Sequence, residues 1–368
     1  MDLPVSFYGL ERFYKTNKET ILNLTHKAFE KGYFLDSSEV TLFEQELANF
    51  VGRKYAVSVS SCTDALFFSL KALGIKKGDE VLVPAFSFIA SLSPILHYQA
   101  TPVFLDINPH DLSLFIEDVE QKITKKTKAI IVVQLFGGVN NFETIENLSK
   151  KYNIPIVEDA AQALGSGYNQ RRAGTLGELS CFSFDPSKII QAFGTGGAVL
   201  TDNEELYQKI KRLHYHGKEQ NNFVEAGYNS RISSSQAALL RWQLLQINKI
   251  INKRTEIAHQ YQQQLSEISE ISMVNYPLSV NSNYHKFAIF AEKRDKLKQY
   301  LAEKGIQTNI HYDRLLFEHP IINNLPYKAD NIKYAHLIKQ KELTLPLYPE
   351  LTNEEINYIC QSIKSFYL

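Results

Sequence analysis

Hydrophobic positions alternate between two patterns along the first two-thirds of the chain. Short apolar runs are typical of buried strands, and apolar residues three or four positions apart are typical of amphipathic helices. Pro94 is expected near the start of one helix or at a kink in it. The pattern predicts strands at 55–61, 80–84, 102–107, 129–137, 154–160, 181–185 and 197–202, and helices at 39–50, 63–74, 87–100, 141–152 and from 204.

Strands that alternate with helices predict a mostly parallel sheet with helices on both faces. A long helical pattern over 232–266 leads into a second part of the chain. That part contains a strand at 286–290, a helix near 293–304 and a final helix from Thr352. We therefore expect two domains, residues 1–246 and residues 247–368.

Polar segments follow three of the predicted strands. They are SSCTD after 55–61, EDAAQ after 154–158 and DPSK after 181–184. Ligands of such sheets bind at the carboxyl ends of the strands. The three segments therefore predict a common site.

Composition narrows the class of protein. The 368 residues hold 40 Lys and Arg and 40 Asp and Glu, so no net charge selects a nucleic acid. Three scattered cysteines favour a reducing compartment, and no signal peptide or membrane span is apparent, which predicts a cytoplasmic protein. His214 and His216 lack a third ligand, so no metal site is expected.

Lys188 lies between a hydrophobic segment and the glycine-rich turn at 194–197. Most lysines are solvated surface charges. A lysine in a cleft loses solvation, and its amine becomes a better nucleophile near neutral pH. The position therefore favours an amine that forms a Schiff base with an aldehyde.

Asp159 ends the hydrophobic run IPIVED. A carboxylate is costly to bury there without a partner, and a helix cap or salt bridge is one explanation. The other is pairing with the protonated ring nitrogen of pyridoxal phosphate, which keeps the ring able to accept electrons. Gln162, one helical turn further on, is placed to hydrogen-bond the ring hydroxyl.

Hydroxyl and thiol side chains stand where a phosphate group is expected. Cys62 and Thr63 follow Ser61 between a predicted strand and helix, where free N–H groups bind phosphate or where a side chain simply caps the helix. Ser183 adds a hydroxyl on a neighbouring strand. Phe88 follows another strand, where it either stacks on a cofactor ring or belongs to the core.

Taken in their order along the chain, these segments resemble those of the DegT/StrS-type sugar aminotransferase family, within the aspartate aminotransferase fold (type I) of pyridoxal-phosphate enzymes. The resemblance covers nearly the whole chain. It implies a large domain with a mostly parallel mixed sheet flanked by helices, and a smaller C-terminal α+β domain. The matching segments are FEQELANFVGRKYAVSVSSCTDAL, GDEVLVPAFSFIASLSPIL, TPVFLDINPHDLSL, IVEDAAQALGSGYNQRRAGTLGELSCFSFDPSK, GTGGAVLTD, RLHYHGK, GYNSRISSSQAALLR, NIHYDRL and LPLYPELTNEEI.

The resemblance also implies a role for each candidate residue. The cofactor, pyridoxal 5′-phosphate, is bound covalently by Lys188 and paired through its ring nitrogen with Asp159. The other contacts are Gln162 at the ring hydroxyl, Cys62, Thr63 and Ser183 at the phosphate, and Phe88 on the ring face. Asn229 reaches the phosphate in the neighbouring subunit, with Arg231 nearby, which implies a homodimer with shared active sites. His311 and Tyr312 either line the sugar pocket or pack in the core.

The implied reaction moves an amino group from an amino acid, by family norm L-glutamate, to a nucleotide-linked keto sugar in deoxyamino sugar biosynthesis. The alternatives are a pyridoxal-phosphate sugar dehydratase and a catalytically silent regulatory or binding protein of the same fold. One branch of the family has His in place of the lysine and removes a hydroxyl, and Lys188 argues against that branch. Departures from the family pattern bear on the sugar; they are Thr195, Ser233, Ser234, Gln134 and Asp313.

Overall fold

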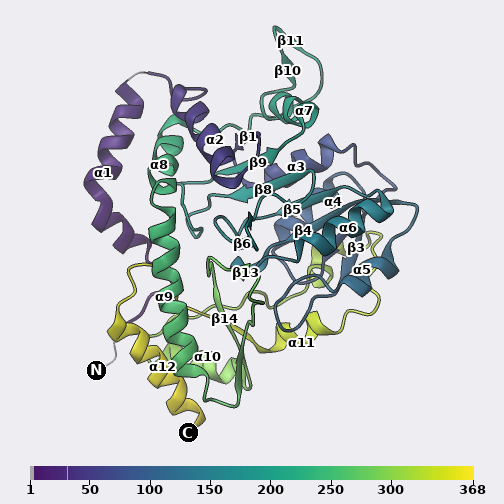
Figure 1. Ribbon diagram of the computed structural model, residues 1–368. Coiled ribbons are helices and arrows are strands. Elements are labelled where there is room, and N and C mark those ends of the chain that lie inside the picture. The colour runs from purple at the N-terminus through teal and green to yellow at the C-terminus, as the bar shows by residue number, and fades with distance from the viewer. Residues whose placement is uncertain (1–3, 31) are drawn as a thin grey trace.

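A seven-stranded sheet forms the centre of the molecule (Figure 1). The computed structural model describes residues 4–30 and 32–368. One strand, β9, is antiparallel to both neighbours and the other neighbouring pairs are parallel, which confirms the expected mostly parallel mixed sheet. In spatial order the strands are β1 (Tyr55–Val59), β9 (Gly197–Thr201), β8 (Leu179–Ser183), β5 (Ile156–Asp159), β4 (Thr127–Val133), β2 (Glu80–Pro84) and β3 (Thr101–Leu105).

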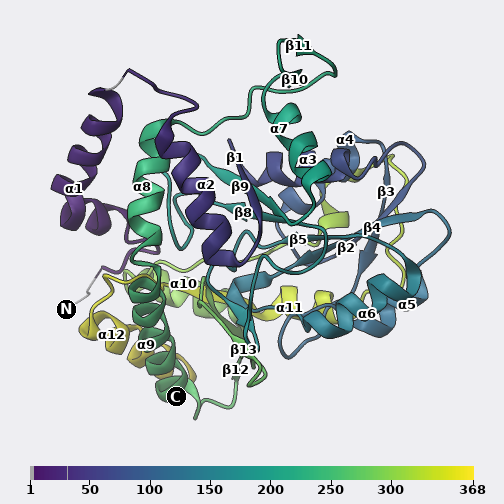
Figure 2. The same ribbon diagram turned by 45° about the horizontal axis from the view of Figure 1, so that its top comes forward.

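Both faces of this sheet are buried. Val81 and Val83 of β2 belong to one hydrophobic cluster, and Leu82 between them belongs to another on the opposite face. Figure 2 shows α3, α4 and α7 on one side of the sheet and α5 and α6 on the other. The helices are α1 (Leu10–Glu30), α2 (Ser38–Val51), α3 (Cys62–Ala72), α4 (Ser93–His97), α5 (Ile116–Lys122), α6 (Phe142–Tyr152), α7 (Glu204–His214), α8 (Ser234–Leu244), α9 (Ile247–Leu265), α10 (Arg294–Glu303), α11 (Tyr334–Lys341) and α12 (Asn353–Tyr367).

A second, antiparallel sheet comes from the C-terminal part of the chain. Its strands are β12 (Ile271–Met273), β14 (Phe287–Ala291) and β15 (Glu342–Leu345), with β14 in the middle. They pack with α9, α10 and α12 around a separate hydrophobic cluster that also includes Val5. The division after residue 246 stays a prediction. The remaining short strands are β6 (Gly167–Tyr168), β7 (Arg171–Arg172), β10 (Lys218–Glu219), β11 (Asn222–Phe223) and β13 (Val280–Asn281).

Three helical segments differ from the sequence expectation. The pattern over 232–266 forms two helices, α8 and α9, which meet at Leu245 and Gln246. Apolar side chains of α8 join the cluster beside α2, whereas most of those buried by α9 join the C-terminal cluster, so the two halves serve different cores. Residues 87–100 form only the 3₁₀ turn η1 (Ile89–Ser91) and the short α4, with Pro94 in its first turn. Helix α1 was not predicted.

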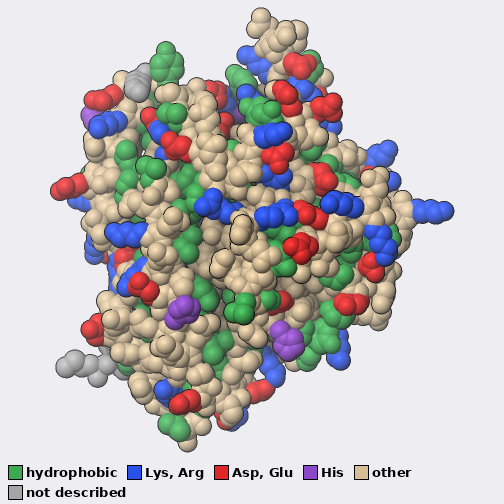
Figure 3. Space-filling model, in the orientation of Figure 1, with side chains coloured by type: hydrophobic (Ala, Val, Ile, Leu, Met, Phe, Trp, Pro, Cys, Tyr) green, Lys and Arg blue, Asp and Glu red, His purple; other side chains and the backbone are tan. Residues whose placement is uncertain are grey.

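Charge is mixed on the surface. Figure 3 shows lysine, arginine and acidic side chains interspersed over the face that it presents. Among the described residues, no helix is both long and apolar enough to cross a membrane.

Candidate active site

The three polar segments meet at one edge of the main sheet. Strands β5 and β8 are parallel neighbours, with Asp159 opposite Cys181, and the chain from β8 leads directly to Lys188. Strand β1 runs in the same direction, and α3 begins at Cys62 just beyond its end. The negative charge of Asp159 and the thiol of Cys62 both act on the pKa of Lys188. The predicted convergence is therefore present in the structure.

Lys188 is held in a turn and is half-buried. Its backbone N–H donates to the carbonyl of Asp185 at 2.9 Å. Burial lowers the pKa of its amine, and the thiol of Cys62 and the charges of Asp185 and Asp159 act in the opposite direction. Because desolvation dominates, the amine carries a proton less firmly than a surface lysine and is more nucleophilic.

Asp159 is a buried carboxylate, only 4% exposed. Its Oδ2 accepts a hydrogen bond from the Ser91 hydroxyl at 2.7 Å, and its Oδ1 accepts one from the backbone N–H of Ala161 at 3.2 Å. Burial raises the pKa of Asp159, while these hydrogen bonds and the charge of Lys188 lower it. The carboxylate has no ion pair within 4.0 Å in the described part of the chain, so a protonated ring nitrogen is a fitting partner.

Ser91 was not identified from the sequence. The one signal was a pair of serines four residues apart, Ser87 and Ser91, whose hydroxyls lie 2.9 Å from each other. The sequence pattern alone does not show that this pair faces Asp159, because the contact joins residues 68 positions apart.

The start of α3 forms a cradle of the kind that binds phosphate. The Ser61 hydroxyl accepts from the N–H of Asp64 at 3.1 Å, which leaves the N–H groups of Cys62 and Thr63 at the open end of the helix. Gly197 of β9 lies directly beneath. A Cβ atom there would lie 2.4 Å from the carbonyl carbon of Ser61. The cradle therefore exists because residue 197 has no side chain.

The other predicted phosphate ligands differ in exposure. Ser183 is half-buried on β8 opposite Gly197, and its hydroxyl accepts from the N–H of Asp185 at 3.3 Å. Thr63 is exposed, so its hydroxyl is accessible to a ligand. Cys62 is buried, and burial raises the pKa of its thiol, which argues against a reactive thiolate.

Gln162 links the sheet edge to the C-terminal part of the chain. Its side-chain N–H donates to the Tyr312 hydroxyl at 3.1 Å, and its carbonyl oxygen accepts from the N–H of Phe136 at 2.8 Å. The Phe88 ring is 55% exposed, and its centroid lies 6.1 Å from that of Tyr312. The structure therefore brings Gln162, Phe88 and Tyr312 together.

His311 lies beside this group. Its Nδ1 is 2.8 Å from the Thr344 hydroxyl, and its ring stacks on Phe7 at 5.9 Å. Burial, followed by the charges of Lys286 and Lys188, lowers the pKa of His311 to about 3. The imidazole is therefore neutral at pH 7, and it serves as a hydrogen-bonding and packing group.

A cavity of about 840 Å³ opens beside Lys188. Its walls come from the N-terminal segment with the first half of α1, the segment around Lys188, the α8–α9 region, the two residues before β14, and the end of β15 with the chain after it. Asp159, Gln162 and the α3 cradle are not in its walls, so the cavity extends away from them on the other side of the lysine. Residues that line it include Phe7, Tyr8, Lys188, Trp242, Lys249, Arg254, Lys286, Tyr348 and Glu350.

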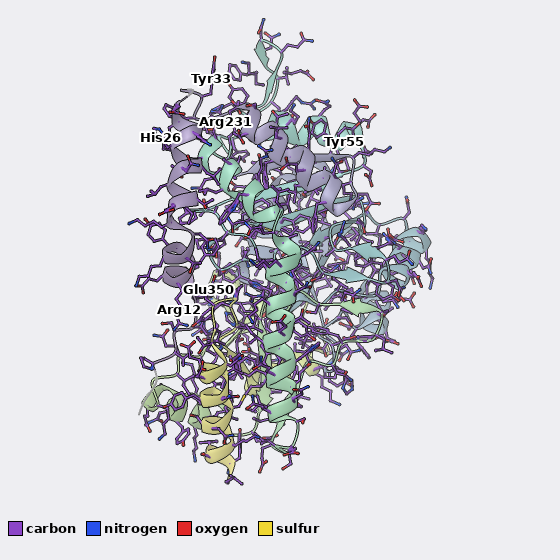
Figure 4. All side chains as sticks on the ribbon, turned by 60° about the vertical axis from the view of Figure 1, so that its left-hand side comes forward. Arg12, His26, Tyr33, Tyr55, Arg231 and Glu350 are labelled. Carbon is purple, nitrogen blue, oxygen red and sulfur yellow. The ribbon has the colours of Figure 1, made fainter. Side chains whose placement is uncertain are left out.

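Asn229 lies away from this cavity. Its side-chain oxygen accepts from Arg231 at 3.2 Å, and Arg231 also pairs with Asp36 at 2.6 Å. Figure 4 places Arg231 near Tyr33 at one end of the molecule, well separated from Glu350 of the cavity wall. The structure therefore does not bring Asn229 to the cavity of its own chain.

This sheet, with its lysine and buried acid, is that of the aspartate aminotransferase fold (type I) of pyridoxal-phosphate enzymes. The chain belongs to the DegT/DnrJ/EryC1/StrS aminotransferase family, whose sequence profile matches residues 15–364.

Proteins of known name align with this chain over nearly its full length. A pleiotropic regulatory protein of Geobacillus stearothermophilus is 33% identical, over 99% of both chains. UDP-2-acetamido-2-deoxy-3-oxo-D-glucuronate aminotransferase of Pseudomonas aeruginosa is 32% identical, over 98% of this chain and 99% of that one. The crystal structure of NtdA from Bacillus subtilis with bound cofactor PMP has a TM-score of 0.90 at 28% identity, over 98% of this chain and 85% of that one.

Proposed function

We propose that this protein is a pyridoxal-phosphate-dependent aminotransferase that moves an amino group from L-glutamate to a nucleotide-linked keto sugar. The observation that carries the proposal is the presence of a desolvated amine, Lys188, and a buried carboxylate without an ion pair, Asp159, at one sheet edge. The relative from Pseudomonas aeruginosa supports the substrate class, because its name is that of a nucleotide-sugar aminotransferase.

The residues at the sheet edge fit each part of pyridoxal phosphate. The N–H groups of Cys62 and Thr63, with the Ser183 hydroxyl, would hold the phosphate. Asp159 would pair with the ring nitrogen, and Lys188 would bind the aldehyde carbon. When bound, the cofactor supplies an electron-accepting ring that stabilises negative charge on a substrate carbon.

Lys188 would carry the proton in each half of the reaction. Its amine would act as the base that takes the proton from the α-carbon of the amino donor and then as the acid that gives a proton back. Asp159 would hold a proton on the ring nitrogen, because a nearby carboxylate stabilises the charged form of that nitrogen. Ser91 orients the carboxylate through its 2.7 Å hydrogen bond. The same groups then act in reverse on the keto sugar.

A homodimer would complete the site. Large apolar side chains are exposed on the loop before α2 and on β11 and the residue after it: Tyr33 is 70% exposed, Phe34 56%, Phe223 70% and Val224 54%. The salt bridge from Arg231 to Asp36 links the Asn229 segment to the first of these loops. Covering these side chains with a second copy would bring Asn229 to the partner's phosphate.

Replacing Asn229 tests this arrangement. Asn229→Ala should weaken retention of pyridoxal phosphate by about tenfold, because a hydrogen bond to a charged group is lost. Cofactor dissociation constants from fluorescence titration provide the measurement. An unchanged constant would count against a contact across the subunits.

A regulatory role is the second candidate, because one relative is named as a regulatory protein. Donor-dependent chemistry separates the candidates. The cofactor-loaded protein would be incubated with L-glutamate and a panel of nucleotide-linked 3-keto and 4-keto sugars, and the products identified by mass spectrometry. An aminated sugar formed only with the donor is expected. A dehydrated sugar formed without the donor, or no product with any sugar, would contradict the proposal.

A further inference from the structure

Lys286 places a second amine in the cavity beside Lys188. It precedes the first residue of β14, and its side chain lies over two aromatic rings of the N-terminal segment, 4.8 Å from the Tyr8 centroid and 5.1 Å from that of Phe7. Its Nζ also donates to the Tyr8 hydroxyl at 3.4 Å. These contacts direct the amine toward the space that a substrate would enter.

No carboxylate neutralises this amine. Between residues 4 and 30 and from 32 onward, no acidic oxygen lies within 4.0 Å of Lys286, whereas Lys122 and Lys339 are paired at 2.8 and 2.6 Å. Glu342 acts on it only at longer range, and burial raises the pKa of that carboxyl to about 8. A half-buried cation is costly without a counter-charge. The surroundings therefore favour an anion that arrives from outside.

The backbone at this position is held firmly. Arg254 is buried and donates to the carbonyl oxygens of Tyr284 at 3.0 Å and of His285 at 2.7 Å. The N–H of Lys286 donates to the carbonyl of Phe136 at 3.2 Å. The arginine thus fixes the two residues before the lysine and adds positive charge without supplying a partner. A preorganised cation of this kind binds an anion with little loss of conformational freedom.

Two residues that line the cavity also have buried polar atoms without partners. Within the described ranges, three buried side-chain atoms lack a hydrogen bond, and two of them, His285 Nδ1 and Tyr348 Oη, belong to residues that line this cavity. Buried polar atoms are normally satisfied by protein, water or ligand. Neither atom is accessible to solvent, so neither contacts a ligand in the cavity, and Lys286 is the group that can.

We propose that Lys286 binds an oxyanion of the substrates, either the carboxylate of the amino donor or the diphosphate of the nucleotide sugar. This inference rests on the proposed function, because it assigns a substrate contact at the same site. The two anions would occupy the cavity in turn, since the two halves of a transamination use one reacting amine. Lys286 is then a specificity residue that lies beside Lys188 and carries no proton in the reaction.

Equilibrium binding tests this assignment without turnover. Calorimetric dissociation constants would be measured for glutarate and for uridine diphosphate, each added to the cofactor-loaded protein and to Lys286→Met. We expect the variant to bind at least one probe about 10- to 100-fold more weakly, the range for a lost charged hydrogen bond. Lys286→Arg, which keeps the charge, should recover part of the affinity. The probe that loses affinity identifies the source of the oxyanion.

Lys304→Met is a matched control. Lys304 also lies over a tyrosine ring, 5.7 Å from the Tyr300 centroid, but it is outside the cavity walls. Its removal should leave both constants unchanged. Constants within twofold of wild type for both probes in Lys286→Met would overturn the inference. Failure of the proposed function is a separate result, because it would appear as no amine transfer by the wild-type protein whatever the probes do.

Discussion

The two sides of Lys188 are built differently. On one side, Asp159 and the α3 cradle are local continuations of β5 and β1, and each polar group follows its own strand. On the other side, the cavity joins segments from the N-terminus, α8–α9, the two residues before β14 and the chain at and beyond the end of β15. The first side consists of polar groups that the carboxyl ends of the strands place there. The second joins segments that are distant in the sequence, and under the proposed function it would recognise the substrates.

This contrast predicts how variants divide. A change on the strand-edge side should reduce chemistry with every substrate, because it alters proton transfer or the electron-accepting ring. A change on the cavity side should alter affinity for particular substrates and leave the chemistry with the others intact. Gln134 is one of the departures from the family pattern, and it can be placed relative to these two sides. Its side chain bonds Glu158 at 2.7 Å inside the fold, away from the cavity walls.

The largest expected effect is that of Lys188→Ala. Turnover should fall by more than about 1,000-fold, because under the proposed function the variant would lose both the covalent contact and the proton carrier. The fold should persist, since the side chain makes no ion pair within 4.0 Å in the described chain. Steady-state rates and circular dichroism check the two statements. Amination at a near wild-type rate would remove the basis of the assignment.

Asp159→Asn should have the next largest effect. A neutral amide cannot stabilise a protonated ring nitrogen, so kcat should fall by about 100- to 1,000-fold for every sugar accepted. Asp202→Asn is the control, because Asp202 follows the antiparallel β9 at the opposite edge of the sheet and pairs with Arg53. It should lower stability and leave kcat unchanged. Equal kcat values for Asp159→Asn and wild type would refute the role.

The same contrast explains what the sequence could predict. Asp159 and Lys188 were found because each follows its own hydrophobic run, and a strand places its next residues at a known edge. Lys286 carries no such local signal, since its contact with Tyr8 spans 278 positions. The break between α8 and α9 was missed for a related reason. The spacing of apolar residues predicts one continuous apolar face. It does not show that the α8 half and the α9 half of that face pack against different hydrophobic clusters.

The pH dependence of anion binding is a sharper test of the cavity side. Burial, then the charges of Lys188 and Arg254, lowers the pKa of Lys286 to about 7 in the ligand-free protein. The amine is charged below that pH and largely neutral above it. The dissociation constant of the anionic probe should therefore rise about tenfold between pH 7 and pH 8.5 as the charge is lost.

The titration of Lys286 must be distinguished from the titration of the other groups that face it. His285 and His311 have lowered pKa values and stay neutral throughout this range, while Asp185 is exposed and acts only at long range. Glu342 gains negative charge near pH 8 and weakens binding in the same direction. Lys286→Met should retain only the contribution of Glu342. An equal slope in the variant and the wild type would assign the pH dependence to the glutamate instead.

Ser91→Ala should have the smallest effect, because it acts through Asp159. Loss of the hydroxyl removes one of two hydrogen bonds to the carboxylate, so kcat should fall by about 3- to 10-fold. The remaining carboxylate would hold its own proton more readily, since that hydrogen bond lowers the pKa of Asp159. The acidic limb of the kcat profile should therefore move to higher pH. Ser93→Ala, whose hydroxyl bonds the carbonyl of Ile89, should leave the profile in place. A purely structural role for Ser91 would lower the melting temperature without moving this limb.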